Sequence, residues 1–237
     1  MNKIKSSVSR VISFRRAILA IVLAPCITAA ADPFIQGYPG KRSYVAGEDV
    51  TFHLSTNVGK VDVEIARIGA EREVVWSKKG IAAGEHPVPR HASSHGCDWP
   101  AAFSVKIPKS WPSGYYEAGT SSGNTQGNRT FFVVRSSQPG RDARILLQLS
   151  TNTYNAYSNW GGFSLYTYWG PAHWNKKHEP GDVLGRRVTF QRPLYRDDFR
   201  RWELPFVQWA ERNGYKIDYA INSDLEFHPE MLKHYKL

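Results

Sequence analysis

Residues 145–166 read ILLQLSTNTYNAYSNWGGFSLY, and this stretch decides how the second half of the chain is expected to fold. It opens with Ile145–Leu149, an apolar run of β-forming length that Ser150 and three further polar residues close. Such a run is typical of a buried strand in a parallel sheet. A long loop at residues 153–166 follows, rich in phenols, amides and glycine. Ligands of open α/β sheets lie outside the carboxyl ends of the strands, so this loop is a candidate binding site.

Helices and a second strand are predicted after the loop. Residues 188–195 have the composition of a short extended segment, and residues 197–213 place apolar side chains at helical spacing, with Pro205 inside the run. Residues 216–220 predict a strand and residues 229–234 a short helix. Strand, loop, helix, strand and helix in this order are typical of the start of a parallel α/β sheet.

The first half of the mature chain, residues 32–135, predicts an antiparallel β-sandwich of immunoglobulin-like size. Short runs there alternate apolar and polar residues, and turn-forming residues separate them. A polar segment with proline and glycine at residues 136–142 is the predicted linker, which makes residues 143–237 a second domain. The predicted strands are residues 44–45, 50–54, 61–65, 74–76, 103–107, 115–116 and 130–134.

The second domain is expected to be incomplete. Lys236 and Leu237 lie where a third strand would begin, and two strands do not form a stable doubly wound sheet alone. We therefore expect either a truncated form of a longer protein or a sheet that a partner chain completes.

Residues 1–31 have the features of a cleaved signal peptide. Five basic residues precede an apolar segment at residues 17–27, and three alanines follow it. This predicts a periplasmic or secreted protein, and Arg15 and Arg16 leave twin-arginine export open. The apolar segment is too short for stable membrane insertion. The remaining chain has 26 Lys and Arg against 21 Asp and Glu, a formal charge of +5, without basic runs, which argues against nucleic acid as a partner.

One cluster of residues in the first half has the chemistry of metal ligands. His91, His95, Cys97 and Asp98 lie within eight residues, and all four types bind zinc. No second ligand pair follows at a zinc-finger spacing, so we favour chance clustering in a loop. Cys97 is the single cysteine outside the signal peptide and is predicted to be a buried thiol.

Three segments give the chain a resemblance to a known family. They are the Ala-Tyr-x-x-Trp-Gly-Gly pattern at residues 156–162, the Arg-Pro segment within residues 185–193, and residues 202–219. With these, the chain from about residue 32 onward resembles the large-subunit (beta-subunit) family of N,N-dimethylformamidase. The resemblance implies a β-sandwich followed by a Rossmann-like α/β domain. It also implies amide hydrolysis at a mononuclear iron held by two tyrosine phenolates and a glutamate.

The resemblance also implies metal ligands by position. Tyr157 in the Ala-Tyr pattern and Tyr195 after the Arg-Pro segment are the implied phenolates, and Tyr154 is the substitute for either. An iron ion lowers the pKa of a coordinated phenol and so holds it as a phenolate. The same ion can polarise an amide carbonyl and lower the pKa of a bound water. The implied glutamate would lie beyond Leu237, so weak or no activity is expected of the chain as it stands. The alternative is that these tyrosines pack or form hydrogen bonds within a structured loop.

Asn155, Asn159 and Trp160 complete the predicted site. They would either orient a small amide substrate in a catalytic role or brace the loop. A homo-oligomer or a small partner subunit is also expected. The alternative function is a non-catalytic secreted binding protein, because the eight Trp and twelve Tyr of the chain would also suit carbohydrate or surface-polymer recognition by the sandwich.

Overall fold

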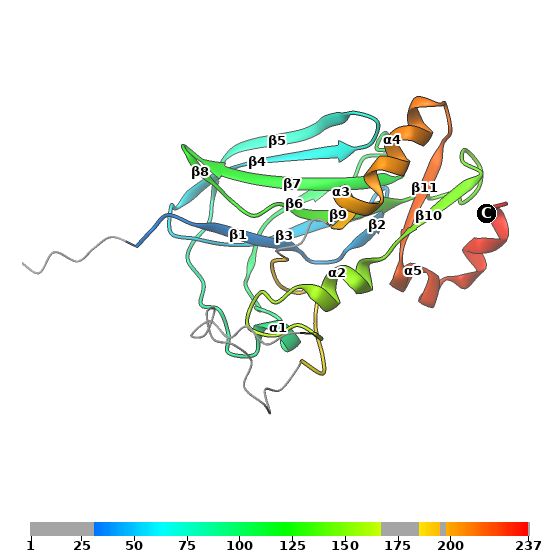
Figure 1. Cartoon of the computed structure of the whole chain (residues 1–237). Coiled ribbons are helices and arrows are strands. Elements are labelled where there is room, and N and C mark those ends of the chain that lie inside the picture. The colour runs from blue at the N-terminus through cyan, green and yellow to red at the C-terminus, as the bar shows by residue number, and fades with distance from the viewer. Residues whose placement is uncertain (1–30, 167–184, 195–197, 237) are drawn as a thin grey trace, which may run out of the picture. The chain divides into compact units, whose positions relative to one another are not determined.

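The structure is a computed structural model that describes residues 31–166, 185–194 and 198–236. Most of the predicted signal peptide and Tyr195 lie outside these residues. The fold is mixed, with antiparallel β-sheets and short helices (Figure 1). The strands are β1 (Ile35–Pro39), β2 (Ser43–Val45), β3 (Asp49–Thr56), β4 (Lys60–Ile68), β5 (Arg72–Ala82), β6 (Ala101–Lys106), β7 (Gly114–Ser122), β8 (Thr125–Gln126), β9 (Thr130–Arg135), β10 (Ile145–Leu149) and β11 (Ile217–Ile221). The helices are α1 (Ala92–His95), α2 (Thr151–Tyr157), α3 (Asp198–Trp202), α4 (Leu204–Arg212), α5 (Asn222–Phe227) and the 3-10 helix η1 (Pro229–His234).

Two sheets share a core in the first half of the chain. One has the order β1-β3-β6, and the other has the order β2-β9-β7-β4-β5, with β8 paired to β7. Strand β4 alternates buried with partly buried or exposed residues over most of its length, as its period-two sequence predicts. Phe52 of β3 and Val105 of β6 pack with Ile65, Tyr116 and Phe132 of the other sheet. The predicted strands of this half are confirmed, and β1 and β8 are additional.

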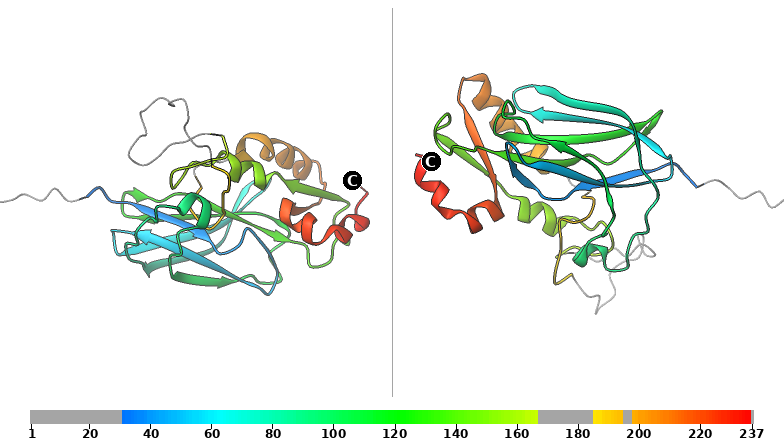
Figure 2. Two further views of the ribbon diagram at one scale, coloured as in Figure 1. Left: turned by 90° about the horizontal axis from the view of Figure 1, so that it is seen from below. Right: turned by 180° about the vertical axis from the view of Figure 1, so that it is seen from behind.

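Strands β10 and β11 form a two-stranded parallel sheet, with Ile145 opposite Ile217 and Leu149 opposite Ile221. Strand β11 is buried along its whole length, as expected of an apolar strand in a parallel sheet. The two predicted strands are therefore confirmed to within one residue. Figures 1 and 2 show α3 and α4 on one side of this pair, and α5 with η1 on the other.

The prediction for the residues after β10 needs a correction. The sequence predicts a polar turn and a loop for residues 151–157, whereas these residues form helix α2. Its N-terminal signals are weak, because Ser150 makes no capping hydrogen bond and the first turn has no acidic residue. The helix buries Thr151, Tyr154, Asn155 and Ala156 instead. Tertiary burial, and not local propensity, therefore explains this helix.

The predicted helix over residues 197–213 is present as two shorter helices, α3 and α4. Pro205 lies in the first turn of α4, where its missing N–H removes no helical hydrogen bond. Gly214, with φ of +81°, follows the last turn, so the predicted end of the helix is confirmed.

Residues 185–194 belong to no helix or strand, yet they are fixed to the first half of the chain. The Thr189 amide donates to the Ser93 carbonyl at 3.1 Å, and the Gln191 carbonyl accepts from the Cys97 amide at 2.9 Å. The predicted extended segment thus makes backbone hydrogen bonds with α1 and with Cys97 just after that helix.

One buried cluster joins side chains from both halves. Phe131 and Val133 of β9 pack in it with Tyr154 of α2, Phe199 of α3 and Tyr219 of β11. Residues 33–237 accordingly group into one compact unit. The division of the chain at residues 136–142 into two domains stays a prediction.

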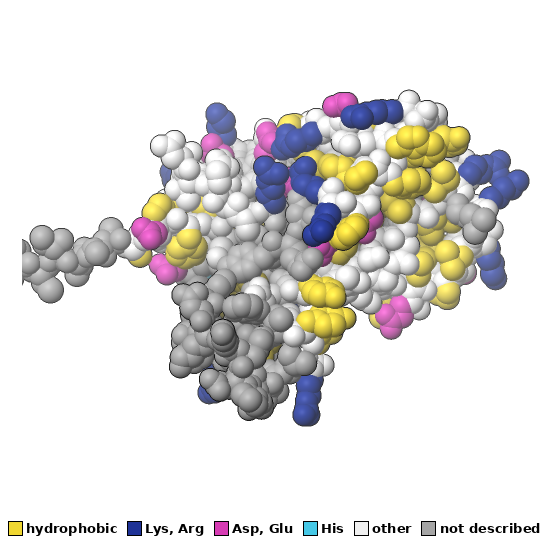
Figure 3. All heavy atoms as spheres, in the orientation of Figure 1, with side chains coloured by type: hydrophobic (Ala, Val, Ile, Leu, Met, Phe, Trp, Pro, Cys, Tyr) yellow, Lys and Arg dark blue, Asp and Glu magenta, His cyan; other side chains and the backbone are white. Residues whose placement is uncertain are grey.

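Helices α3 and α4 also carry exposed aromatic side chains. Trp202 is 65% exposed and Trp209 is 56% exposed, and the Trp209 ring stacks on Tyr215 with centroids 5.7 Å apart. Figure 3 shows hydrophobic side chains gathered over these helices, with Lys and Arg beside them. Within the described ranges, no helix has the length and hydropathy needed to cross a bilayer.

Candidate functional site

Arg192 holds together the loop that follows α2. Its guanidinium group is completely buried, and Nη1 donates to the Trp160 carbonyl. Nη2 donates to the Ser158 carbonyl at 2.9 Å and to Asn155 Oδ1 at 3.2 Å, and Nε donates to the Thr189 carbonyl at 3.0 Å. Burial lowers the pKa of Arg192 to about 10, so the group stays charged at neutral pH. One buried cation therefore binds the loop at several of its backbone carbonyl groups.

This network shows where the three predicted substrate-orienting residues lie. Asn155 is buried, and its side-chain oxygen accepts from Arg192. Trp160 is buried with its ring edge-on to Trp99, at a centroid distance of 5.9 Å. Asn159 is partly exposed, and its carbonyl accepts from the Gly162 amide at 3.0 Å. Asn155 and Trp160 thus make bracing contacts, and a catalytic role for the three residues stays a prediction.

Tyr154 and Glu203 form a phenol–carboxylate pair. The Tyr154 hydroxyl donates to Glu203 Oε1, and the Tyr154 ring is buried edge-on to Phe131 at 6.0 Å. Burial raises the pKa of the phenol, and the bond to Glu203 raises it further. Burial also raises the pKa of the Glu203 carboxyl, while the Tyr154 hydroxyl and nearby backbone amides oppose that rise. Glu203 Oε2 is buried without a well-aligned hydrogen bond among the described residues.

The other implied phenolates are placed differently. Tyr157 follows Tyr154 by one turn of α2 but is exposed, and its ring stacks on Tyr166 with centroids 4.3 Å apart. Tyr195 lies outside the described residues. The structure therefore buries one candidate ligand and exposes another, and the three-tyrosine set stays a prediction.

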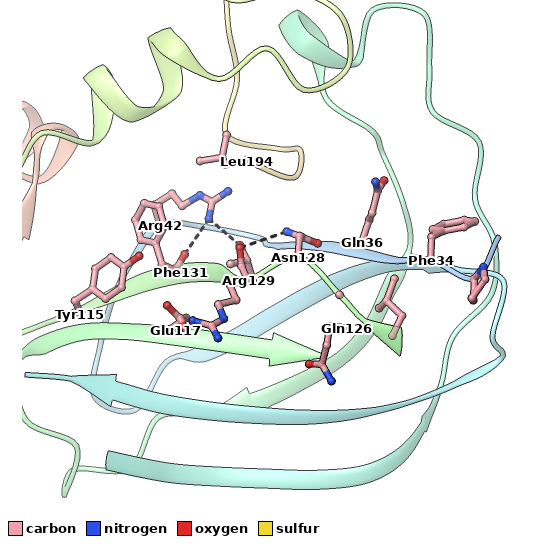
Figure 4. A pocket seen from close by; sticks show the side chains of 14 residues that line it. Phe34, Gln36, Arg42, Tyr115, Glu117, Gln126, Asn128, Arg129, Phe131 and Leu194 are labelled. Atoms are coloured by element: carbon pink, nitrogen blue, oxygen red, sulfur yellow. Dashed lines mark hydrogen bonds and ion pairs between the residues drawn. The ribbon is translucent and has the colours of Figure 1, made fainter. Parts of the chain in front are cut away.

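A cavity of about 530 Å³ opens beside Leu194, the residue that precedes Tyr195 (Figure 4). Its wall includes Phe131, on which the Tyr154 ring packs, so Tyr154 lies one ring behind the wall. The volume is in the range of small-molecule sites. The cavity is lined by Pro33, Phe34, Ile35, Gln36, Arg42, Tyr115, Glu117, Gln126, Gly127, Asn128, Arg129, Thr130, Phe131 and Leu194.

Charged groups are built into this wall. Arg42 is 3% exposed, and its Nη1 donates to Thr130 Oγ1 at 3.0 Å and to the Phe131 carbonyl at 2.9 Å. Burial lowers the pKa of Arg42 to about 10, which leaves it protonated at neutral pH. Buried Glu117 accepts from Arg200 Nη2 at 2.8 Å and pairs with Arg129 Nη1 at 3.5 Å. The cavity therefore combines cationic, anionic and apolar surface.

The possible zinc ligands do not assemble in the part of the chain that the structure describes. No group of three or more His, Cys, Asp or Glu side chains there could hold a metal ion. Cys97 is a free, buried thiol, as predicted, and burial raises its pKa to about 12. His95 Nδ1 forms a 2.8 Å hydrogen bond with Ser94 Oγ, and its ring meets His91 edge-on.

Three features of this candidate site were not visible in the sequence. Arg192 stands within a motif that the sequence singles out, but most of its acceptors lie 29 to 37 residues earlier in the chain. Glu203 directly follows Trp202 in another motif, and its pairing with Tyr154 depends on the docking of α3 and α4 against α2. Arg42 has no local signal, because it stands beside Lys41 in the short connection between β1 and β2 and its acceptors are far along the chain.

Comparisons with known proteins complete the description of the site. A family model described as "N,N-dimethylformamidase beta subunit-like, C-terminal" matches residues 62–237, which is well over half of the chain. The match begins in β4 and therefore includes most of the sandwich half as well as every site residue of the second half. A search of curated proteins gives no match.

Proposed function

The chain belongs to the N,N-dimethylformamidase beta subunit-like family, and from this membership we propose that it hydrolyses the C–N bond of an amide. The family match over residues 62–237 is the observation that carries the proposal. The reaction adds one water to the amide and yields a carboxylic acid and an amine. The cavity beside Leu194 would receive the amide. The buried Tyr154 ring packs behind its wall against Phe131, and Leu194 directly precedes Tyr195 in the chain.

The described residues fit part of an iron site. Tyr154 and Glu203 present hard oxygen donors in contact, the donor type that iron accepts. Glu203 Oε2 lacks a well-aligned partner among the described residues, which is consistent with a position for a cation or a proton. Two tyrosines would supply the phenolates: Tyr157 and Tyr195 are the implied pair, and Tyr154 is the substitute for either. When bound, iron would polarise the amide carbonyl and lower the pKa of a water molecule.

The residues of this chain would act mainly by holding their groups in place. Tyr154 is neutral without a cation, because burial and the Glu203 carboxylate both raise its pKa. It would lose its proton only together with the binding of a cation. Arg192 would hold the C-terminal end of α2, which bears Tyr157, to the loop that follows it, through Asn155 and Ser158. We also propose that β10, α2 and β11 belong to a Rossmann-like domain, since the two strands are parallel and helices connect them.

The experiment is a metal and activity analysis of the purified protein. We expect bound iron, a visible phenolate-to-iron absorption band, and weak release of dimethylamine and formate from N,N-dimethylformamide. Tyr157→Phe and Tyr195→Phe should each weaken the band and the activity, and Tyr154→Phe should do so where Tyr154 replaces one of them. Tyr215→Phe is the control, because Tyr215 is an exposed tyrosine just after α4, where its ring stacks on Trp209. A protein without iron and without amide hydrolysis would overturn the proposal, and a band unchanged in all three variants would overturn the ligand assignment.

A further inference from the structure

The charges around the cavity beside Leu194 do not balance. Glu117 is the one carboxylate among the lining residues, and it is already paired with Arg200 at 2.8 Å and with Arg129 at 3.5 Å. Arg42 adds a further cation to the wall. Among the lining residues, Arg42 and Arg129 therefore stand against one carboxylate, which leaves an excess of positive charge at the cavity wall (Figure 4).

Arg42 is a buried cation without a carboxylate partner in the described part of the chain. It donates to Thr130 Oγ1 and to the carbonyls of Phe131, Phe190 and Arg192, and the last two bonds are long, at 3.3 and 3.4 Å. Its Nε is covered and has no hydrogen-bond partner among the described residues. Enclosing a cation without a counter-charge is costly. An anion in the adjacent cavity would offset that cost through a medium of low dielectric constant.

Arg129 can make the direct contact with such an anion. Its side chain is 66% exposed, and its ion pair with Glu117 is loose, at 3.5 Å. An exposed guanidinium group with one loose bond can turn its planar fork towards a carboxylate and bind both oxygens. Glu117 would remain paired with Arg200 while Arg129 binds the ligand.

The rest of the wall fits an organic ligand better than a free inorganic anion. Phe34, Phe131 and Leu194 provide apolar surface, and Gln36 and Gln126 provide amide groups that can pair with another amide. A neutral, very small amide would leave the cationic wall uncompensated.

We propose that this cavity binds an amide that also carries a carboxylate, as N-acylated amino acids do, with Arg129 holding the carboxylate. The inference rests on the proposed amide hydrolysis for the identity of the ligand. Its test is nevertheless a binding measurement, so that the two proposals can fail separately.

The probes are N-acetylglycine and its uncharged analogue N-acetylglycinamide, titrated into the purified protein at neutral pH by isothermal calorimetry. We expect N-acetylglycine to bind about tenfold more tightly than the neutral analogue. Arg129→Gln should weaken the binding of N-acetylglycine about tenfold and leave that of the neutral analogue unchanged. Glu117→Gln should tighten the binding of N-acetylglycine, because it removes the competing carboxylate; structural damage would have the opposite effect.

Arg212→Gln is the matched control. Arg212 has a 58% exposed side chain and a 3.5 Å ion pair with Glu71, so it resembles Arg129 except that it does not line the cavity. Equal binding of the two probes would overturn the proposal, as would equal losses in Arg129→Gln and Arg212→Gln. Acetate bound as tightly as N-acetylglycine would overturn the assignment of an amide. If neither probe binds while dimethylformamide is hydrolysed, this inference fails and the proposed function stands.

Discussion

Arg42 and Arg192 are both almost completely enclosed, yet their surroundings use the two guanidinium groups differently. Arg192 donates from all three nitrogens to acceptors in its loop. Arg42 stands in a cavity wall with an unpartnered Nε and two long bonds. Neither has a carboxylate partner in the described ranges. Burial alone therefore does not reveal the role of a charged side chain. A guanidinium group whose N–H donors all have acceptors is a structural brace, whereas one with an unpartnered donor remains available to a ligand.

The largest effect is expected from Arg192→Met. The change leaves several buried carbonyls and the Asn155 side chain without a donor, and removing such a network costs about 3–5 kcal/mol of unfolding free energy. Urea unfolding followed by circular dichroism measures the loss. Arg192→Lys is the control, and it should recover only part of the loss, because an ammonium group cannot reproduce the planar fork. A loss below about 1 kcal/mol would contradict the assignment of Arg192 as the brace.

Arg42→Met should cost less, about 1–3 kcal/mol. The substitution leaves Thr130 Oγ1 and the Phe131 carbonyl without their donor, but it also removes a buried cation that lacks a counter-charge. The same urea experiment gives the comparison. If Arg42→Met were as damaging as Arg192→Met, the distinction between the two arginines would disappear.

Glu203 extends the comparison to a partly buried acid, whose contribution to stability depends on pH. Its pKa is raised in the folded state, so the folded protein binds more protons than the unfolded chain above the ordinary carboxyl pKa of about 4.3. Its contribution to stability is therefore complete below that pH and is lost as pH rises through the folded pKa.

Tyr154→Phe removes a hydroxyl that lowers the pKa of Glu203, so it should cost about 1–2 kcal/mol at pH 7 and less at pH 4. Unfolding free energies of the variant and the parent protein at both pH values test this. An equal cost at the two pH values would show that Glu203 is not the partner that matters.

The smallest effect is expected from Arg72→Ala. Arg72 and Glu64 form an ion pair in which both side chains are nearly half exposed, and such pairs contribute about 0.5 kcal/mol or less. Thermal unfolding should show little change against the parent protein. A loss comparable to that of Arg42→Met would mean that the exposure of a charged side chain does not decide how much it contributes to the free energy of unfolding.

The sequence predicts the strands well, because alternation and apolar runs are local properties. Strand β1 escapes prediction because it contains both glycine and proline, residues that are depleted in strands. Helix α2 escapes prediction because its stability comes from burial against other elements and not from caps. In the site, the motifs locate Tyr154, Asn155 and Arg192 along the chain, but their contacts are long-range and no local pattern encodes them.

The irregular segment at residues 185–194 has a consequence for how the protein folds. Arg42 reaches the carbonyls of Phe190 and Arg192 across 148 and 150 residues of chain, and the Cys97 amide reaches the Gln191 carbonyl across β6 to β10 and α2. Contacts of such high sequence separation slow folding, because the entropy of closing long loops is lost before the contacts form. During synthesis the sandwich strands emerge well before residue 190, so this closure comes late. Until then Arg42 has no partner from this segment, and the nascent sandwich is the species most exposed to misassembly.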